Sequence, residues 1–164
     1  MEDDATFIGY LTSLNESGNR GALADLRRGL SGEPWNEVKM HKYVVPKLTD
    51  SMYPWDQKVY YMVAALFASN PNTGGKGDMG ETMAHLSLIT DSQSVESRFI
   101  SLLDAHPDDL FDRLRYTVSL LKSKEISVDW YKLCHDLKRW NDPERSTQNR
   151  WSRSYWKMKE IKEE

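Results

Sequence analysis

The chain has 164 residues, of which 39% are hydrophobic and 29% charged, and its mean hydropathy is −0.69. These values exclude a disordered chain and are typical of one globular unit, or of two small lobes with a shared core. No run approaches the ~18 apolar residues of a membrane-spanning helix, and the acidic N-terminus is unlike a signal peptide. A single cysteine excludes an internal disulfide. We therefore expect a cytoplasmic protein with no membrane partner.

In the first half of the chain, apolar residues recur with helical spacing and never alternate as they do in strands. The expected helices cover residues 4–15, 21–30, 36–48 and 53–70. Pro46 should bend or end the third helix at Val45, because proline disfavours helical geometry in the residue before it. The fourth segment is apolar on most of its circumference, so we expect it to be the central helix of the core.

The second half begins with the loop "NPNTGGKGDMGE", which is rich in glycine. The expected helices that follow cover residues 81–90, 94–104, 107–124, 128–140 and 145–161. Each of the last two has an apolar face and a basic face. The sequence therefore predicts an all-α, compact helical bundle of about eight or nine helices. We expect two small lobes, residues 1–90 and 91–164, around the shared core.

No group of residues has the spacing of a catalytic or metal site once simpler explanations are considered. The acidic segment at residues 104–112 is explained by a helix that begins at Pro107 and carries carboxylates in its first turn. The "TGGKGD" segment lacks the Ser or Thr that follows the lysine of a phosphate loop, so we interpret it as a connector. Cys134 lies on an apolar face and is interpreted as a core residue. We therefore expect no enzyme activity, no metal and no cofactor.

The formal net charge of −3 hides an uneven distribution. Residues 1–16 carry acidic charges only, whereas residues 132–159 carry eight basic residues against three acidic ones. On helical geometry the basic side chains form three stripes: Arg20, Arg27 and Arg28; Lys132 and Arg139; Arg150, Arg153 and Lys157. Arginine predominates in them, as phosphate recognition favours. Composition alone leaves open whether these stripes are solvated faces or a nucleic-acid surface.

The order of several motifs is more specific than composition. An Arg-Arg pair in "ALADLRRGL" precedes "EPW", a central apolar helix, "RLRYTVSLL" and "VDWYKLCHDLKRWNDPERSTQNRWSRSYW". This order resembles the CasB family, the small subunit of the type I-E CRISPR surveillance complex Cascade, over essentially the whole chain. The resemblance implies a non-catalytic, all-α subunit in the cytoplasm of a prokaryote. Its implied partners are the backbone and large subunits of Cascade, CRISPR RNA and target DNA, with two copies of the protein in each complex.

The resemblance implies that the protein stabilises the R-loop and the displaced DNA strand in antiviral defence. Pairing of guide RNA with DNA is a near-balanced exchange, so cations that contact strand phosphates can tip it. Matches to the family motifs give the nucleic-acid-binding residues Arg27, Arg28, Arg115, Lys138, Arg139 and Arg145. Helical geometry adds Arg20, Lys132, Arg150, Arg153 and Lys157. Within the arginine pair, Arg28 points further from the leucine stripe and is better placed for a phosphate.

The alternative function is a helical adaptor that mediates only protein–protein contacts in an assembly. Tryptophan and tyrosine commonly anchor such interfaces. Under this alternative, Trp151, Tyr155 and Trp156 would lie on the surface and contact partner subunits.

Overall fold

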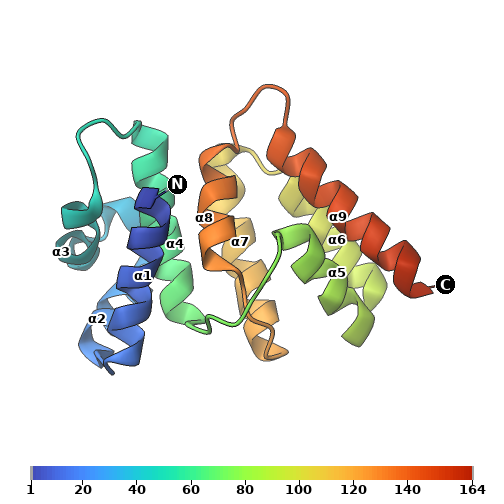
Figure 1. Ribbon diagram of the computed structural model, residues 1–164, viewed down its shortest axis with the longest axis horizontal. Helices are drawn as coiled ribbons and strands as arrows, with labels where there is room; N and C mark the ends of the chain where they lie inside the picture. Colours follow the sequence, from blue (N-terminus) through green and yellow to red (C-terminus); the bar gives the residue numbers. More distant parts are fainter. Residues whose placement is uncertain (1, 164) are drawn as a thin grey trace.

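The structure, a computed structural model, describes residues 2–163 of the chain. Within this range it contains nine α-helices, four short 3₁₀ turns and no strand, so the all-α prediction is confirmed (Figure 1). The α-helices are α1 (Glu2–Glu16), α2 (Arg20–Arg27), α3 (His41–Val44), α4 (Pro54–Ser69), α5 (Met79–Ile89), α6 (Ser92–Leu103), α7 (Pro107–Ser123), α8 (Trp130–Lys138) and α9 (Ser146–Glu163).

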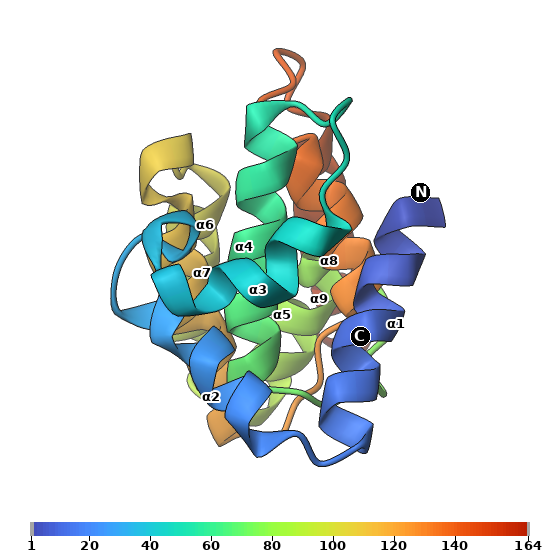
Figure 2. The same ribbon diagram turned by 90° about the vertical axis from the view of Figure 1, so that its left-hand side faces the viewer.

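Helix α4 is the central helix that the sequence predicts. Pro54 occupies its first turn, where the missing N–H costs no hydrogen bond. Every residue from Val59 to Ala68 is buried. The helix packs against α2 on one side and against α7 and α8 on the other (Figures 1 and 2). Its apolar circumference is therefore explained by neighbours on opposite sides.

Helices α5, α6 and α9 form the end of the molecule that is distant from α1–α3 (Figure 1). Gly80 allows α5 and α9 to pack closely there, because a Cβ at this position would lie 2.0 Å from the carbonyl oxygen of Trp151 in α9. The buried residues of the two ends form one continuous core cluster. The expected lobe boundary between residues 90 and 91 stays a prediction. Helix α5 precedes this boundary but packs mainly against α6 and α9, which follow the boundary.

The segment between α2 and α4 differs from the prediction of one helix over residues 36–48. It contains α3, of only four residues, flanked by 3₁₀ turns at Val38–Met40 and Val45–Lys47. The predicted break at Pro46 is present, but the start is also irregular, because the Glu37 side chain accepts a hydrogen bond from the backbone N–H of Lys39 at 3.2 Å. Such capping of a short turn competes with a continuous helix.

The glycine-rich loop at residues 70–78 is held against the segment that leads into α8. The indole N–H of Trp130 donates to the carbonyl oxygen of Asn72 at 3.1 Å, and the side chain of Asn70 donates to that of Ile126 at 3.1 Å. A Cβ at Gly75 would lie 2.5 Å from the carbonyl carbon of Val128. The glycine therefore permits two stretches of backbone to touch.

The buried carboxylate of Asp136 joins α8 to α9. Only 1% of this residue is exposed. One carboxylate oxygen forms an ion pair with Arg150, and the other accepts a hydrogen bond from the indole N–H of Trp151 at 2.8 Å. Its backbone carbonyl accepts a further bond from the hydroxyl of Thr147 at 3.1 Å. Three residues of α9 therefore depend on one residue of α8.

We expect Asp136→Ala to lower the free energy of unfolding by about 3 kcal/mol, because Arg150 and the Trp151 indole lose their buried partner. The melting temperature should fall by roughly 6–12 °C, as measured by calorimetry or circular dichroism. The control is Glu160→Gln, which removes an exposed carboxylate from α9. Equal melting temperatures for Asp136→Ala and the control would contradict this role.

Cys134 lies in the core, as the sequence predicts. Burial, and then the nearby Asp4 carboxylate, raise the pKa of its thiol well above the usual value. Because the thiolate is the reactive form, we expect iodoacetamide to alkylate the folded protein at pH 8 at least about 100-fold more slowly than the protein in guanidinium chloride. Mass spectrometry measures both rates, and equal rates would show that the thiol is accessible.

Candidate nucleic-acid interface

The two arginines at the end of α2 have different environments. Arg27 donates a hydrogen bond to the carbonyl oxygen of Ala68 at 3.3 Å, in the last turn of α4. It thereby satisfies one of the carbonyls that a helix C-terminus leaves without an internal partner. Arg28 pairs with Glu37 at 3.4 Å, and its side chain stays 58% exposed. Both residues are exposed, but Arg27 helps to dock α2 on α4, whereas Arg28 has only a surface ion pair.

Two further arginines bind backbone carbonyls of distant segments. Arg115 in α7 donates to the carbonyl oxygen of Leu30 and pairs with Asp112 at 3.2 Å. Arg145 precedes α9 and donates to the carbonyl oxygen of Leu103 at 2.7 Å. Both guanidinium groups therefore join segments that are far apart in the sequence.

Lys138 in α8 pairs with the buried carboxylate of Asp4 in α1. Its ammonium nitrogen also lies 4.8 Å from the ring centroid of Tyr60, whose hydroxyl donates to Asp4 at 3.0 Å. Burial, and then the Asp4 carboxylate, raise the pKa of Tyr60 well above its usual value. If Lys138 left this cluster, the buried Asp4 carboxylate would lose its cation, so Lys138 stays beside Asp4. Asp136 holds Arg150 in the same way.

Five other predicted cations do not hold the fold together. Their side chains form no ion pair and no hydrogen bond with other described residues, and they are Arg20, Lys132, Arg139, Arg153 and Lys157. Arg139 lies at the C-terminal end of α8. Arg153 and Lys157 are one turn apart on the exposed face of α9. Arg20, at the start of α2, is also exposed. The three exposed residues in the C-terminal part of the chain, Arg139, Arg153 and Lys157, which we call the α8–α9 cations, are candidates to contact a phosphate.

Exposed aromatic residues lie beside some of the cations, and sequence reasoning missed them. Tyr53 is 76% exposed and lines a pocket of about 330 Å³ together with Arg139. Tyr116 is 61% exposed, and the guanidinium of Arg115 lies 5.4 Å from its ring centroid. Such rings are able to stack on unpaired bases. The sequence contains one signal for Tyr53, which directly precedes Pro54. Because Pro54 occupies the first turn of α4, Tyr53 lies outside the helix.

The C-terminal tryptophans are structural instead. Trp140 and Trp151 are buried, with ring centroids 5.3 Å apart. The indole N–H of Trp140 donates to the carbonyl oxygen of Ala105 at 3.0 Å. A buried indole with a satisfied N–H contributes to packing and is not available for stacking on a base.

The acidic segment at residues 104–112 acts as a helix start. The ring nitrogen Nδ1 of His106 accepts a hydrogen bond from the backbone N–H of Asp108 at 3.1 Å, and Pro107 occupies the first turn of α7. In the described residues, no group of three His, Cys, Asp or Glu side chains is arranged to hold a metal ion. The same part of the chain has no helix with the length and hydropathy to cross a membrane.

Comparisons with known proteins agree with this architecture. A family model described as CRISPR-associated protein Cse2 matches residues 22–156. The CRISPR-associated protein Cse2 of Thermus thermophilus is 34% identical over 160 residues, which cover 95% of this chain and 91% of that protein. The crystal structure of M. ruber CasB superposes with a TM-score of 0.82 at 30% identity, and the match covers 98% of this chain and 96% of that one.

A chain in a structure named CRISPR RNA-guided surveillance complex has the same fold, with a TM-score of 0.83 at 23% identity. That match covers 98% of this chain and 95% of the other. The family model spans most of the sequence, and the Thermus relative matches nearly end to end. The chain therefore belongs to the Cse2 family of CRISPR-associated proteins, and the resemblance to CasB that its motifs predict is confirmed.

Proposed function

We propose that this protein is a non-catalytic structural subunit of an RNA-guided CRISPR surveillance complex, in which it stabilises the R-loop and the displaced DNA strand. The observation that carries the proposal is the presence of the exposed α8–α9 cations, Arg139, Arg153 and Lys157, which form no ion pair with other described residues. Family membership supports the assignment to CRISPR defence. The shared fold with a surveillance-complex chain supports the assignment to a complex.

The chemistry required for this role is modest. Exchanging a DNA duplex for an RNA–DNA duplex is nearly balanced in free energy, so a few contacts to the displaced strand shift the equilibrium. Such contacts need cations along the phosphates and exposed rings for stacking, and no reading of base sequence. The α8–α9 cations and Tyr53 provide both kinds of group.

The assembly is part of the proposal because the protein alone is acidic. With a formal net charge of −3, the isolated chain should bind DNA weakly at physiological salt. Within a complex, the neighbouring subunits raise the effective concentration of the strand at these cations. The partners we propose are two copies of this protein, the backbone and large subunits, CRISPR RNA and target DNA, in the prokaryotic cytoplasm.

The adaptor alternative gains no support from the aromatic residues on which it was based. Trp151 and Tyr155 are buried in the core, so they are not available to contact a partner. Only Trp156 of that group is partly exposed, at 38%.

We expect the triple variant Arg139→Ala, Arg153→Ala, Lys157→Ala to weaken retention of target DNA by the assembled complex. Each lost phosphate contact reduces the salt dependence of binding by about 0.7 for a single strand, so the slope of log K against log[salt] should fall in magnitude by about 2. Filter binding at several salt concentrations measures this slope. The subunit composition of the purified complex should be unchanged.

The matched control for that experiment is Arg98→Ala, which removes an exposed arginine from α6. It should leave the slope at the wild-type value. An unchanged slope in the triple variant would contradict the assignment of the α8–α9 cations. An equal reduction per charge in Arg98→Ala would show that only the total charge matters.

A second experiment separates the roles of the arginine pair. We expect Arg27→Ala to lower the free energy of unfolding by about 1 kcal/mol, because it removes the bond to Ala68. Arg28→Ala should change it by less than about 0.5 kcal/mol, because exposed ion pairs contribute little. Arg28→Ala should instead weaken DNA retention by the complex roughly tenfold. Wild-type retention across all salt concentrations would show that Arg28 is not a contact.

A further inference from the structure

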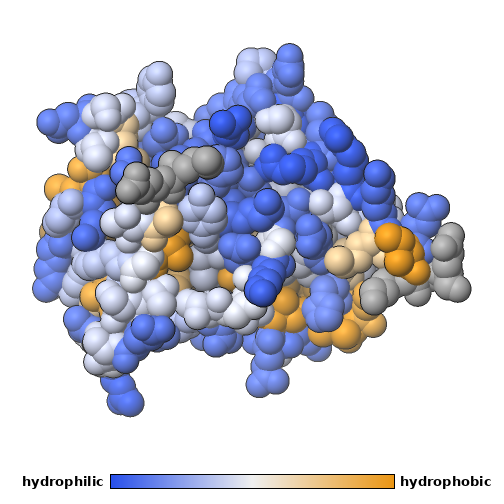
Figure 3. All heavy atoms as spheres, viewed as in Figure 1, coloured by the Kyte–Doolittle hydropathy of each residue, from blue (hydrophilic) through white to orange (hydrophobic). Residues whose placement is uncertain are grey.

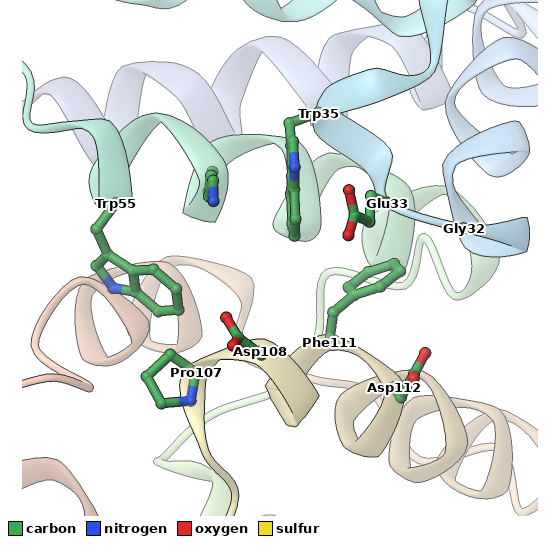
Figure 4. A pocket seen from close by; sticks show the side chains of 9 residues that line it. Gly32, Glu33, Trp35, Trp55, Pro107, Asp108, Phe111 and Asp112 are labelled. Carbon is green, nitrogen blue, oxygen red and sulfur yellow. The ribbon is translucent and has the colours of Figure 1, made fainter.

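A pocket of about 320 Å³ lies where the 3₁₀ turn at Pro34–Asn36 and α4 face the first turns of α7 (Figure 4). Three aromatic rings contribute to its lining: Trp35, Trp55 and Phe111. The carboxylates at its edge are those of Glu33, Asp108 and Asp112. Figure 4 shows the carboxyl groups of Glu33 and Asp108 pointing into the space between the rings. None of these residues belongs to the predicted nucleic-acid surface.

The lining is held in place by bonds to the rest of the fold. The indole N–H of Trp55 donates to the carbonyl oxygen of Leu137 at 2.8 Å. Phe111 is buried in the core. The side chain of Asn36 donates to the Glu33 carboxylate at 2.7 Å. The pocket is therefore preformed, which reduces the entropy lost when a ligand binds.

The charges of the pocket are only partly balanced. Asp112 is paired with Arg115 at 3.2 Å, and the ring of His106, 3.5 Å from Asp108, is charged only when protonated. Glu33 forms no ion pair with another described residue. The one cation in the lining is Lys58. Carboxylates thus outnumber cations, which disfavours a phosphate and favours a cationic ligand.

The protein already places one cation on an aromatic wall of this pocket. The ammonium nitrogen of Lys58 lies 4.8 Å from the ring centroid of Trp35, a typical cation–π distance. An arginine side chain suits the remaining features better than a lysine does. Its planar guanidinium stacks on aromatic rings, and its N–H groups form paired hydrogen bonds with carboxylates.

The size and surroundings of the pocket point to a protein as the source of that arginine. Its volume is at the small end of ligand pockets, which span about 300–1,000 Å³, so it suits a single side chain. A second, more apolar groove of about 560 Å³ adjoins it and shares Trp35 and Lys58. Val45 and Leu48 contribute to this groove. A free amino acid would leave it empty, whereas a protein segment fills both.

We propose that this pocket binds an arginine side chain of another protein subunit, with an apolar side chain of the same segment in the adjoining groove. The identity of the partner as a fellow subunit rests on the proposed function, but the proposal does not depend on nucleic-acid binding. The pocket is then a protein-binding surface, separate in chemistry from the α8–α9 cations.

The chemistry is tested on the isolated protein with N-acetyl-arginine methylamide as the probe. NMR signals of the Trp35 and Trp55 indole N–H groups, assigned with single Trp→Phe variants, should shift during titration with a dissociation constant in the millimolar range. The uncharged analogue N-acetyl-citrulline methylamide should bind at least about tenfold more weakly. Equal binding of the two probes, or no shift of either signal, would overturn the proposal.

The partner is tested in the assembled complex with the double variant Glu33→Lys, Asp108→Lys. The matched control is Asp109→Lys, an exposed residue in the same first turn of α7 that does not line the pocket. We expect the double variant to co-purify with the other subunits at least about tenfold less than the control does, because like charges now face each other. Circular dichroism should show the same helix content for both proteins.

The outcomes distinguish this proposal from the proposed function. If the wild-type protein does not co-purify with a guide-RNA complex, the proposed function fails, and the NMR titration still decides whether the pocket binds arginine. If the wild-type protein, the control and the double variant all co-purify equally, the pocket proposal is wrong and the proposed function stands.

Discussion

The structure depends on two buried carboxylates that each have a cation from another helix beside them. Asp4 and Asp136 are both almost fully buried, and each takes a positive side chain from another helix: Lys138 for Asp4 and Arg150 for Asp136. Both pairs involve α8, which is thereby joined to α1 on one side and to α9 on the other. Because a buried ion pair loses much of its hydration, it adds little net stability compared with apolar packing, yet losing one partner is costly. The pairs therefore fix how the outer helices are placed more than they stabilise the fold.

Local patterns along the chain were predictable from the sequence, whereas contacts between distant helices were not. The helices from α4 onward were predictable because their apolar spacing is long and regular, and the buried faces of α8 and α9 followed from it. The short turns around α3 were not, since capping by Glu37 is decided by a single side chain. Among the cations, spacing along one helix reveals acidic neighbours on that helix only. The partners of Lys138 and Arg150 come from other helices, so their structural use was invisible in the sequence.

The surface divides into regions of different chemistry. Exposed cations without an ion partner among the described residues include Arg139 at the end of α8 and Arg153 and Lys157 of α9, whereas carboxylates and aromatic rings line the pocket between α4 and α7. Hydrophobic side chains collect at the end where α5 and α9 lie (Figure 3), where the exposed residues include Ile89 and Ile161. An acidic protein with these separate regions is suited to an assembly in which each neighbour meets a different surface. A uniformly basic protein would bind nucleic acid at any orientation, without a defined place in the complex.

The contact at Gly80 controls where the outer face of α9 lies. Helix α9 rests directly on the backbone of α5, and a methyl group at Gly80 would lie only 2.0 Å from the carbonyl oxygen of Trp151, so there is no room for it. Any other residue at this position would push α9 outward and carry Arg153 and Lys157 with it. The position of two charges on the outer face is thus set by the absence of a side chain on the inner face. A mutation that alters no charge would then displace the proposed phosphate contacts as effectively as one that removes an arginine.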